Sequence, residues 1–518
     1  MRRMTALTLA LTLAISLTAC GTKAETQEEA KTTYDGATAI LLSDDGITVD
    51  GALASTDETA AVYTANDIVF YLEGQDFTYG EGSETDGHSQ TEADAHTVVH
   101  ITQPGTYVLS GTLSAGQVAV DLGKDADEDP NAVVTLVLDG VDITCTVAPA
   151  VIFYNVYECG SADAESATKD VDTFSAGANV IIADGTINHI TGSYVARIYK
   201  PDSVELSEDG TEVTDAKKLH KYDGAFYSKM SMNVNSEAQG TGVLNILAEN
   251  EGLDSELHLT INGGNIHITS GNDGINTNED GVSVTTVNGG TLTINVNGTT
   301  GEGDGIDSNG WLVINGGSQD SGIDSDNGIY INGGTVAASG NMLDRIDGGA
   351  QPYVVFGFRQ RQQGGTAITL KAEDGTVAEE WTPANDFTYL VVSSPALTEG
   401  TYTLWSGETQ LAGAAGMTGG MGGGPRPDGG KPPEGMTPPE GDPSQKPERP
   451  QPNKDGTMTL PDGTIIDPAD IKRPENGGRP ELPEGFGGRP EDMKATEVST
   501  DFVLTSEGGT FGNIAPAE

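Results

Sequence analysis

Four short acidic phrases recur within one stretch of this chain, and carboxylates repeated in this way can bind a cation. Each phrase reads glycine, an aliphatic residue, Asp or Asn, then Ser or Thr, and the phrases begin at Gly252, Gly274, Gly305 and Gly322. No lysine or arginine occurs between Lys229 and Arg345. The counter-ion for these carboxylates must therefore come from elsewhere in the protein or from solution.

Aligning the phrases predicts which oxygen atoms come together. Two carboxylates about 4.8 Å apart repel by roughly 3 to 4 kcal/mol at an effective dielectric constant near 20. A hard cation relieves that repulsion, and Ca²⁺ accepts six to eight oxygen ligands from flexible loops. Solvated turn residues are the alternative interpretation, and the spacing does not match an EF-hand loop. The predicted Ca²⁺ ligands are Asp254, Asp273, Asn276, Asp304, Asp307, Asp324 and Asp326.

Short strands must position these phrases. An Asn-Gly-Gly sequence closes an alternating apolar run at Asn262, Asn288, Asn315 and Asn332, with spacings of 26, 27 and 17 residues. Alternation of apolar residues is typical of strands with one buried and one exposed face. The irregular spacing fits a solenoid whose coils differ in loop length. Asn-Gly is also a hairpin signal, but the phrases return in the same order, so we predict an all-β parallel β-helix.

The same alignment predicts ladders of side chains along that fold. Leu259, Thr285, Leu312 and Ile329 are expected to point inward, as are Ile261, Val287, Ile314 and Ile331. The residues expected to point outward are His258, Thr260, Val284, Thr286, Trp311, Val313, Gly328 and Tyr330. The repeated asparagines are expected to stack and hydrogen-bond along the axis, while asparagine and glycine supply left-handed turn conformations.

The N-terminus predicts export and a lipid anchor. Residues 1–19 combine two arginines, an apolar run over 6–17 and small residues before Cys20, which is the pattern of a bacterial lipoprotein signal peptide. The apolar run is too short for an ordinary spanning helix. We therefore expect Cys20 to carry lipid and to hold the protein on the outer face of the bacterial cytoplasmic membrane, with no other membrane contact.

Composition restricts the partners and divides the chain. The net charge of −52 repels nucleic acid and anionic headgroups. We expect a monomer with a tether and lead-in over 20–64, a β-helix over 65–412, a disordered glycine- and proline-rich insertion over 413–493, and a last strand and tail over 494–518. Cys145 and Cys159 are left open as either a disulfide or two thiols.

Taken in order, several phrases resemble a known family. They begin at Pro104, Leu138, Asp223 and Ser393 and include the acidic and Asn-Gly-Gly repeats. Together they are similar to the clostridial carbohydrate-binding β-helix family over about 65 to 405. The resemblance implies a right-handed parallel β-helix shaped like pectate lyases, calcium in the solenoid, and binding to cellulose or acidic plant polysaccharides without demonstrated cleavage. The short third coil and the proline-rich insertion depart from the family's pattern.

Several functions remain open from the residues. Trp311 and Tyr330 fall on one predicted outer face and could stack against sugar rings, although sheet packing also explains them. A pectate-lyase-like enzyme needs a basic residue near bound calcium, and such residues only flank the acidic stretch. Nothing singles out a carboxylate pair for a glycosidase. A polysaccharide-binding surface protein is therefore favoured over a lyase, a glycosidase or a structural adhesin, and an enzyme is not expected.

Overall fold

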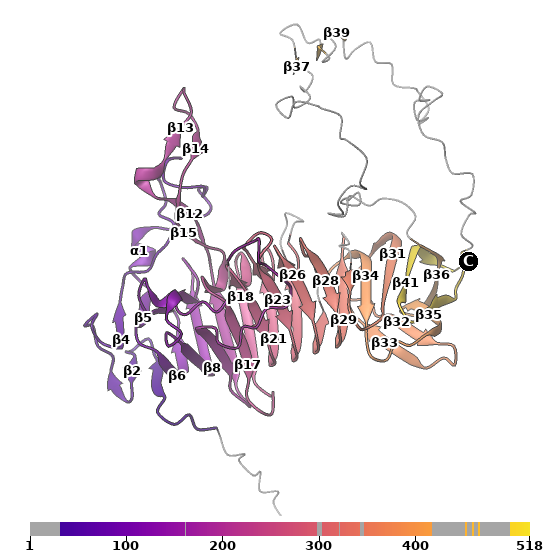
Figure 1. Cartoon of the computed structure of the whole chain (residues 1–518), viewed down its shortest axis with the longest axis horizontal. Coiled ribbons are helices and arrows are strands. Elements are labelled where there is room, and N and C mark those ends of the chain that lie inside the picture. The colour runs from indigo at the N-terminus through magenta and orange to yellow at the C-terminus, as the bar shows by residue number, and fades with distance from the viewer. Residues whose placement is uncertain are drawn as a thin grey trace, which may run out of the picture.

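The computed structural model describes residues 32–160, 162–297, 303–320, 322–341, 346–416 and 498–517, together with the backbone of three short strands, β37 (Gln451–Pro452), β38 (Met458–Thr459) and β39 (Ile465–Ile466). Strands lie side by side along the long axis of the molecule (Figure 1). The helical elements of this part of the chain are α1 (Gln90–Ala93), η1 (Ala126–Glu128) and η2 (Pro201–Ser203). The all-β prediction is therefore confirmed.

Some predictions fall outside these residues. The signal peptide over 1–19, Cys20 and most of the segment 413–493 are not described. Within the described part, no helix has the length and apolar character needed to span a membrane.

An eight-stranded sheet carries the acidic phrases. Its strands are β4 (Val62–Ala65), β5 (Thr97–Ile101), β7 (Gly116–Asp121), β9 (Val151–Asn155), β16 (Gly224–Ser228), β19 (Glu251–Ser255), β22 (Ile275–Thr277) and β25 (Ile306–Ser308). From β5 to β25 every neighbour is parallel, whereas β4 pairs antiparallel to β5. Residues at the same height in successive strands therefore stack across this sheet.

A second sheet of 26 strands contains two further parallel series. The first series comprises β6 (Gly105–Leu113), β8 (Val134–Cys145), β10 (Ala178–Ile182), β17 (Met232–Ser236), β20 (Leu259–Ile261), β23 (Val284–Val287), β26 (Trp311–Ile314), β28 (Gly328–Ile331) and β30 (Ile346–Gly348). The second comprises the end of β8, then β11 (Ile187–Gly192), β18 (Val243–Ala248), β21 (Asn265–Ser270), β24 (Thr291–Val296), β27 (Ser318–Asp320) and β29 (Thr335–Gly340). Buried and more exposed residues alternate in β10, β11, β18 and β21, as apolar alternation requires.

Both ends of the 26-stranded sheet are antiparallel. At the start, β1 (Thr38–Leu42), β2 (Thr48–Val49) and β3 (Ala52–Leu53) form hairpins. The far end contains β31 (Tyr353–Gln362), β32 (Ile368–Ala372), β33 (Val377–Trp381), β34 (Phe387–Ser393), β35 (Gly400–Ser406), β36 (Thr409–Ala415), β40 (Phe502–Leu504) and β41 (Gly508–Pro516). Here every pairing is antiparallel except that of β31 with β41.

These pairings correct the predicted fold class. A right-handed parallel β-helix over residues 65–412 is wrong for this chain, because the structure consists of large sheets of mixed pairing. Residues 353–416 and 502–516 form antiparallel strands around a separate core, in which Phe356, Phe502 and Phe511 pack together. The physical reason is that this part carries no repeated phrase to continue a parallel series, so its strands return through short turns instead.

The asparagine ladder is confirmed. Each side-chain amide donates to the side-chain oxygen of the preceding rung, over 2.8 to 2.9 Å, along Asn332, Asn315, Asn288, Asn262 and Asn235. The predicted register holds as well: Leu259, Thr285, Leu312 and Ile329 pair in sequence and are all buried. The second glycine after each repeated asparagine has a positive φ, between 87° and 104°.

The opposite face of these strands is less exposed than expected. His258, Thr260, Val284, Val313 and Gly328 are buried, so the prediction of an exposed face is wrong for them. Part of the cause is the segment 156–177, called the strap here, whose described residues reach β17 and β20 and the side chain of His258. Thr173 hydrogen-bonds Asn233 and Thr260 there, both over 2.7 Å.

Cys145 and Cys159 are free thiols. Cys145 is buried in β8 and Cys159 is half-buried in the strap. The sequence left open whether these two residues form a disulfide, and in this structure they do not.

Two features project from the sheets or leave them. A spur formed by β12 (Val195–Tyr199) and β15 (Lys218–Tyr222), with the hairpin of β13 (Glu205–Leu206) and β14 (Val213–Asp215) at its tip, stands out near α1 (Figure 1).

At the other end of the body, Gly413 and Ser499 exchange two backbone hydrogen bonds of 2.9 and 2.8 Å. The chain thus leaves the body after β36 and returns to the same place.

Candidate metal centre

The acidic ladder is positioned by in-register parallel pairing. Phe226, Leu253, Ile275 and Ile306 pair in sequence on β16, β19, β22 and β25, and all are completely buried. The residue after each therefore points to the other face of the sheet. Those residues are Tyr227, Asp254, Asn276 and Asp307, and the backbone N–H of Asp324 bonds to the carbonyl of Ile306 to add the next rung.

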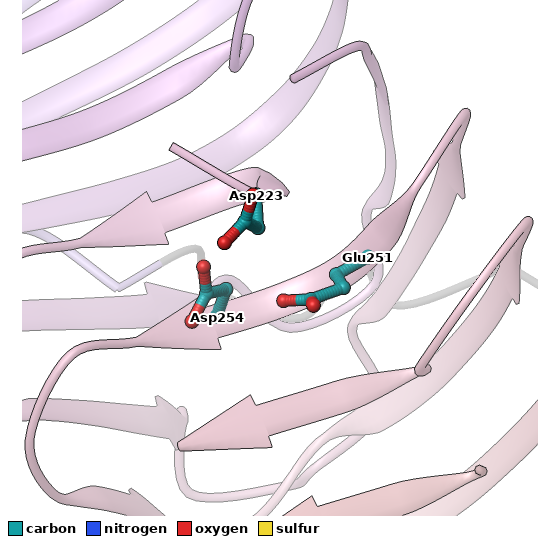
Figure 2. A group of neighbouring side chains, drawn as sticks. All are labelled: Asp223, Glu251 and Asp254. Carbon is teal, nitrogen blue, oxygen red and sulfur yellow. The ribbon is translucent and has the colours of Figure 1, made fainter. Parts of the chain in front are cut away.

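Three carboxylates converge at one end of this ladder. Asp223, Glu251 and Asp254 each offer an oxygen, and these oxygens lie within 4.8 Å of one another. Figure 2 shows the three side chains directed toward a common space. Their exposed fractions are only 8%, 5% and 0%, so water is largely excluded. A group of ionised carboxylates so deeply buried is costly unless it is compensated.

The hydrogen bonds around the cluster leave specific oxygens without partners. Asn278 donates to Oδ1 of Asp254 over 2.7 Å, and Asn276 donates to Oε1 of Glu251 over 3.2 Å. The second oxygen of each carboxylate, Oδ2 and Oε2, has no hydrogen-bond partner among the described residues, and neither has Oδ1 of Asn276. An unsatisfied buried acceptor costs about 1 to 3 kcal/mol. Oxygen atoms of this kind are the ligands that a hard cation prefers.

Burial and mutual repulsion dominate the electrostatics. Burial, followed by the charge of Asp223, raises the pKa of Glu251 well above its usual value. Burial and then the charges of Glu251 and Asp223 do the same for the pKa of Asp254. Lys221 provides partial compensation, since its ammonium lies 2.5 Å from Oδ2 of Asp223. One ammonium leaves the cluster with excess negative charge.

A glycine makes room for Asp254. A Cβ placed on Gly224 would lie 2.5 Å from the Cβ of Asp254, closer than real Cβ contacts. Gly224 is therefore required for Asp254 to occupy its place beside Asp223 and Glu251.

The predicted ligands beyond the cluster form a continuation toward solvent. Oδ1 of Asp273 accepts a hydrogen bond from the backbone N–H of Asp304 over 2.6 Å. Burial, opposed by that bond, raises the pKa of Asp273 to about 6. Burial and then the charges of Asp273 and Asp324 raise the pKa of Asp307 to about 7.

The seven predicted ligands thus divide into two groups. Asp254 and Asn276 lie at the buried cluster, while Asp273, Asp304, Asp307 and Asp324 extend it and Asp326 is exposed. Asp223 and Glu251 were not chosen from the sequence. A signal for them exists, because each precedes a glycine as Asp273 and Asp304 do.

The predicted aromatic pair lies on the other sheet. Trp311 is on β26 and Tyr330 on β28, both half-buried, whereas the acidic ladder is on the eight-stranded sheet. Lys169 of the strap lies over Tyr330, with its Nζ 5.3 Å from the ring centroid. That ring is therefore already in contact with a cation from the chain itself.

Comparison with known proteins gives three findings. A model of the family described as carbohydrate-binding domain-containing protein matches residues 95–160 and 177–378, just over half of the chain. A protein of that description from Acetivibrio thermocellus is 28% identical over 184 residues, which is 35% of this chain and 47% of the relative, so the match spans about half of the relative's length. A solved structure of a polysaccharide lyase-like protein from C. thermocellum, as a gadolinium derivative, is 20% identical and covers 60% of this chain and 99% of that one with a TM-score of 0.33, a likeness too weak to support an argument.

Proposed function

This chain belongs to the carbohydrate-binding domain-containing protein family, and we propose that it binds polysaccharide with the help of Ca²⁺ held at the acidic ladder. The observation that carries the proposal is the buried cluster of Asp223, Glu251 and Asp254 with its partnerless oxygens. All the available donor atoms are carboxylate or amide oxygens, which fit a hard cation and not a soft one.

The residues present would hold the ion as follows. Asp223, Glu251 and Asp254 would supply charge, and Asn276 would supply a neutral oxygen. Bound Ca²⁺ supplies positive charge that neutralises the cluster and attracts anionic groups. Lys221 already pairs with Asp223 and so limits the charge that the cation has to compensate.

The outer rungs support an acidic polysaccharide as the ligand. Asp273, Asp304, Asp307 and Asp324 continue from the buried cluster, and the last three are partly exposed. A uronate polymer such as polygalacturonate would be repelled by these carboxylates alone. Further Ca²⁺ between protein and polymer carboxylates turns that repulsion into attraction, so binding should require the ion. Neutral cellulose, by contrast, would need the aromatic face of Trp311 and Tyr330.

The location proposed for this activity is the cell surface. The support is the sequence around Cys20, which matches lipoprotein processing. Cys20→Ala should move the protein from the membrane fraction to the soluble fraction, and an unchanged distribution would refute the anchor.

The calcium proposal is tested by titration and by melting. Calorimetric titration of Ca²⁺ into the chelator-treated protein should give saturable binding, and Ca²⁺ should raise the melting temperature, because a ligand of the folded state stabilises it. Asp254→Asn should weaken the tightest site by at least about tenfold. Asp374→Asn, which changes an exposed turn carboxylate, is the matched control and should bind Ca²⁺ like wild type.

The polysaccharide proposal is tested on the same samples. Polygalacturonate should retard the protein in affinity electrophoresis with Ca²⁺ but not with EDTA, and Asp254→Asn should reduce the retardation. Retardation of Trp311→Ala and Tyr330→Ala should match that of wild type. Equal retardation with and without EDTA would contradict the bridging role of the ion, and retention on cellulose lost in the aromatic variants would favour the other face.

One observation favours a second candidate function, a polysaccharide lyase. Lys221 and Lys218 lie next to the acidic cluster, paired with Asp223 and Glu256, so a basic residue does reach the site where such an enzyme needs one. Burial lowers the pKa of Lys221, but the charge and hydrogen bond of Asp223 outweigh it and leave that pKa raised. A protonated ammonium is a poor base at neutral pH. Release of unsaturated uronate that disappears in Lys221→Ala would establish the enzyme.

A further inference from the structure

One cavity is lined by no residue of the acidic ladder, although its lining residue His220 precedes Lys221 in the sequence. It has a volume of about 470 Å³ and lies between residues 68–79 and the spur, lined on the spur side by residues 198–220. Small-molecule sites typically measure about 300 to 1,000 Å³. Residues 68–79 precede the first residue matched by the family model, so half of this cavity is built from sequence outside that match.

The cavity is held open by backbone hydrogen bonds. The N–H of Tyr199 donates to the carbonyl of Tyr79 over 2.8 Å, and the N–H of Glu81 donates to the carbonyl of Arg197 over 2.9 Å. Gly80 allows this approach, since a Cβ at that position would lie 2.2 Å from the Arg197 carbonyl oxygen. The two walls are thus fixed to each other before any ligand arrives.

The lining combines aromatic and aliphatic surface with polar groups. Phe70, Tyr79 and Tyr199 contribute rings. Gln75 and the hydroxyl of Tyr79 form no hydrogen bond within the described residues, and Nδ1 of His220 is paired with Tyr222 over 2.6 Å, which leaves Nε2 available. No lysine or arginine lines the cavity.

We propose that this cavity binds one unit of a neutral saccharide, independently of Ca²⁺. Aromatic faces accept the C–H faces of a sugar ring, and amide, phenol and imidazole groups can exchange hydrogen bonds with its hydroxyls. An anionic sugar would meet Asp76 and no lysine or arginine in the lining, in a protein whose net charge is −52. Arg197 lies behind the lining, 5.7 Å from the Tyr199 ring centroid, and is paired with Glu81. The ligand class rests on the proposed carbohydrate binding, but the cavity and its chemistry do not depend on the acidic ladder.

Blocking the mouth of the cavity tests the proposal. Leu219 lines the cavity and is 46% exposed, so Leu219→Arg should fill it without disturbing a core. Leu206 is 45% exposed on the hairpin at the tip of the spur and does not line the cavity, which makes Leu206→Arg the matched control. Tyr79→Phe removes one hydroxyl and keeps the ring. The probes are linear tetrasaccharides of glucose, mannose and xylose, with tetragalacturonate for comparison, all titrated calorimetrically in EDTA.

The expected result is saturable binding of at least one neutral probe in EDTA. Leu219→Arg should weaken it by at least about tenfold, Tyr79→Phe by a few-fold, and Leu206→Arg by less than about twofold. Tetragalacturonate should not bind in EDTA. Absence of binding by all three neutral probes, or equal binding by wild type and Leu219→Arg with unchanged melting temperatures, overturns the inference.

The proposal of Ca²⁺-dependent polysaccharide binding and the proposal of a neutral-sugar cavity can be refuted independently of each other. Asp254→Asn should lose the Ca²⁺-dependent binding of polygalacturonate and keep the binding of the neutral probe, whereas Leu219→Arg should do the reverse. Loss of both activities in either variant would show that the two sites are not independent and would refute the separate cavity.

Discussion

At the scale of single residues, the candidate metal centre depends on the side chains that surround the carboxylate of Asp254. Its carboxylate is completely buried, Asn278 donates to Oδ1, and one of its oxygens lies within 4.8 Å of oxygens of Asp223 and Glu251. The sequence predicted Asp254 and Asn276 because repeated phrases align them. It did not single out Asp223, because that residue is not part of a complete phrase and comes close only through the folding of the preceding strand.

Gly224→Ala should disable the centre without touching a ligand. The added methyl would meet the Cβ of Asp254, and such overpacking typically costs about 1 to 3 kcal/mol. We expect Ca²⁺ affinity to fall by at least about tenfold, measured by calorimetric titration. Gly400→Ala, where the nearest atom to the new Cβ is 3.8 Å away, is the control. Wild-type affinity in Gly224→Ala would show that Asp254 is not a ligand.

Stability should depend on pH through Asp307. Its pKa of about 7 lies above the usual value of 3.8, so the folded state binds a proton that the unfolded state does not. Stability of the chelator-treated protein should therefore rise as pH falls from about 8 to 6.5, on the order of 1 kcal/mol. The measurement is urea unfolding at both pH values, with Asp307→Asn as the comparison that should reduce the change; the raised pKa of Asp273 leaves part of it in place.

One group opposes this change. Burial lowers the pKa of His258 to about 4, so the unfolded state takes up a proton near pH 6.5 that the folded state does not, and this offsets part of the gain, by about 0.4 kcal/mol at pH 6.5. Protons should also compete with Ca²⁺ for the same oxygens, so Ca²⁺ affinity should fall on acidification. A decrease in stability from pH 8 to 6.5 in EDTA would contradict the raised pKa of Asp307.

At the scale of elements, the asparagine ladder shows what repetition in sequence can specify. Identical residues at identical rungs predict the register, the inward side chains and the amide hydrogen bonds, and all three are confirmed. Repetition could not reveal the strap, which has no repeat of its own. Most of it, residues 161–176, falls between the two ranges that the family model matches.

Asn288→Ala should destabilise the protein more than a surface substitution normally does. Its amide donates to Asn262 and accepts from Asn315, so two hydrogen bonds are lost, each worth about 0.5 to 1.5 kcal/mol. The free energy of unfolding, measured in urea, should fall by about 1 to 2 kcal/mol. Asn327→Ala, at an exposed asparagine whose side chain forms no hydrogen bond with the described residues, controls for simple loss of an amide. Equal stability of Asn288→Ala and wild type would mean that water replaces the ladder without cost.

The strap also changes how the aromatic prediction should be understood. Trp311 and Tyr330 were predicted as a sugar platform from their positions on one face, and that role stays a prediction. The structure adds that Lys169 covers one of the two rings and that Thr173 fixes the strap to the neighbouring strands. A sugar using this face would have to displace Lys169, which explains why the acidic ladder is the better-supported site.

At the scale of the whole molecule, the sequence predicted strands correctly and their global arrangement incorrectly. Local alternation and the repeated phrases identify strands between 252 and 340, where each rung copies its neighbour. Beyond Gly348 the chain carries no such copy, and a second aromatic core around Phe356 and Phe511 organises antiparallel strands. That core is assembled from residues more than a hundred positions apart, which no local pattern encodes.

Replacing residues 417–497 by a linker of about six residues should leave the body intact. Paired antiparallel residues lie about 5 Å apart, and six residues can extend about 20 Å, so the ends can be joined without strain. We expect the melting temperature and the response to Ca²⁺ to stay within experimental error of wild type, measured by calorimetry. Failure of the shortened chain to fold would show that the deleted residues contribute to the body.

The paired backbone at Gly413 and Ser499 has a consequence for engineering. Because both ends of the excursion emerge at one point, a guest domain whose own termini are close together could be spliced there and would be held by two tethers instead of one. A fluorescent reporter placed in this position would lie at the opposite end of the molecule from β2 and β4 (Figure 1). The protein thus has an insertion point at which a guest domain can be introduced while the surroundings of both candidate binding sites stay unchanged.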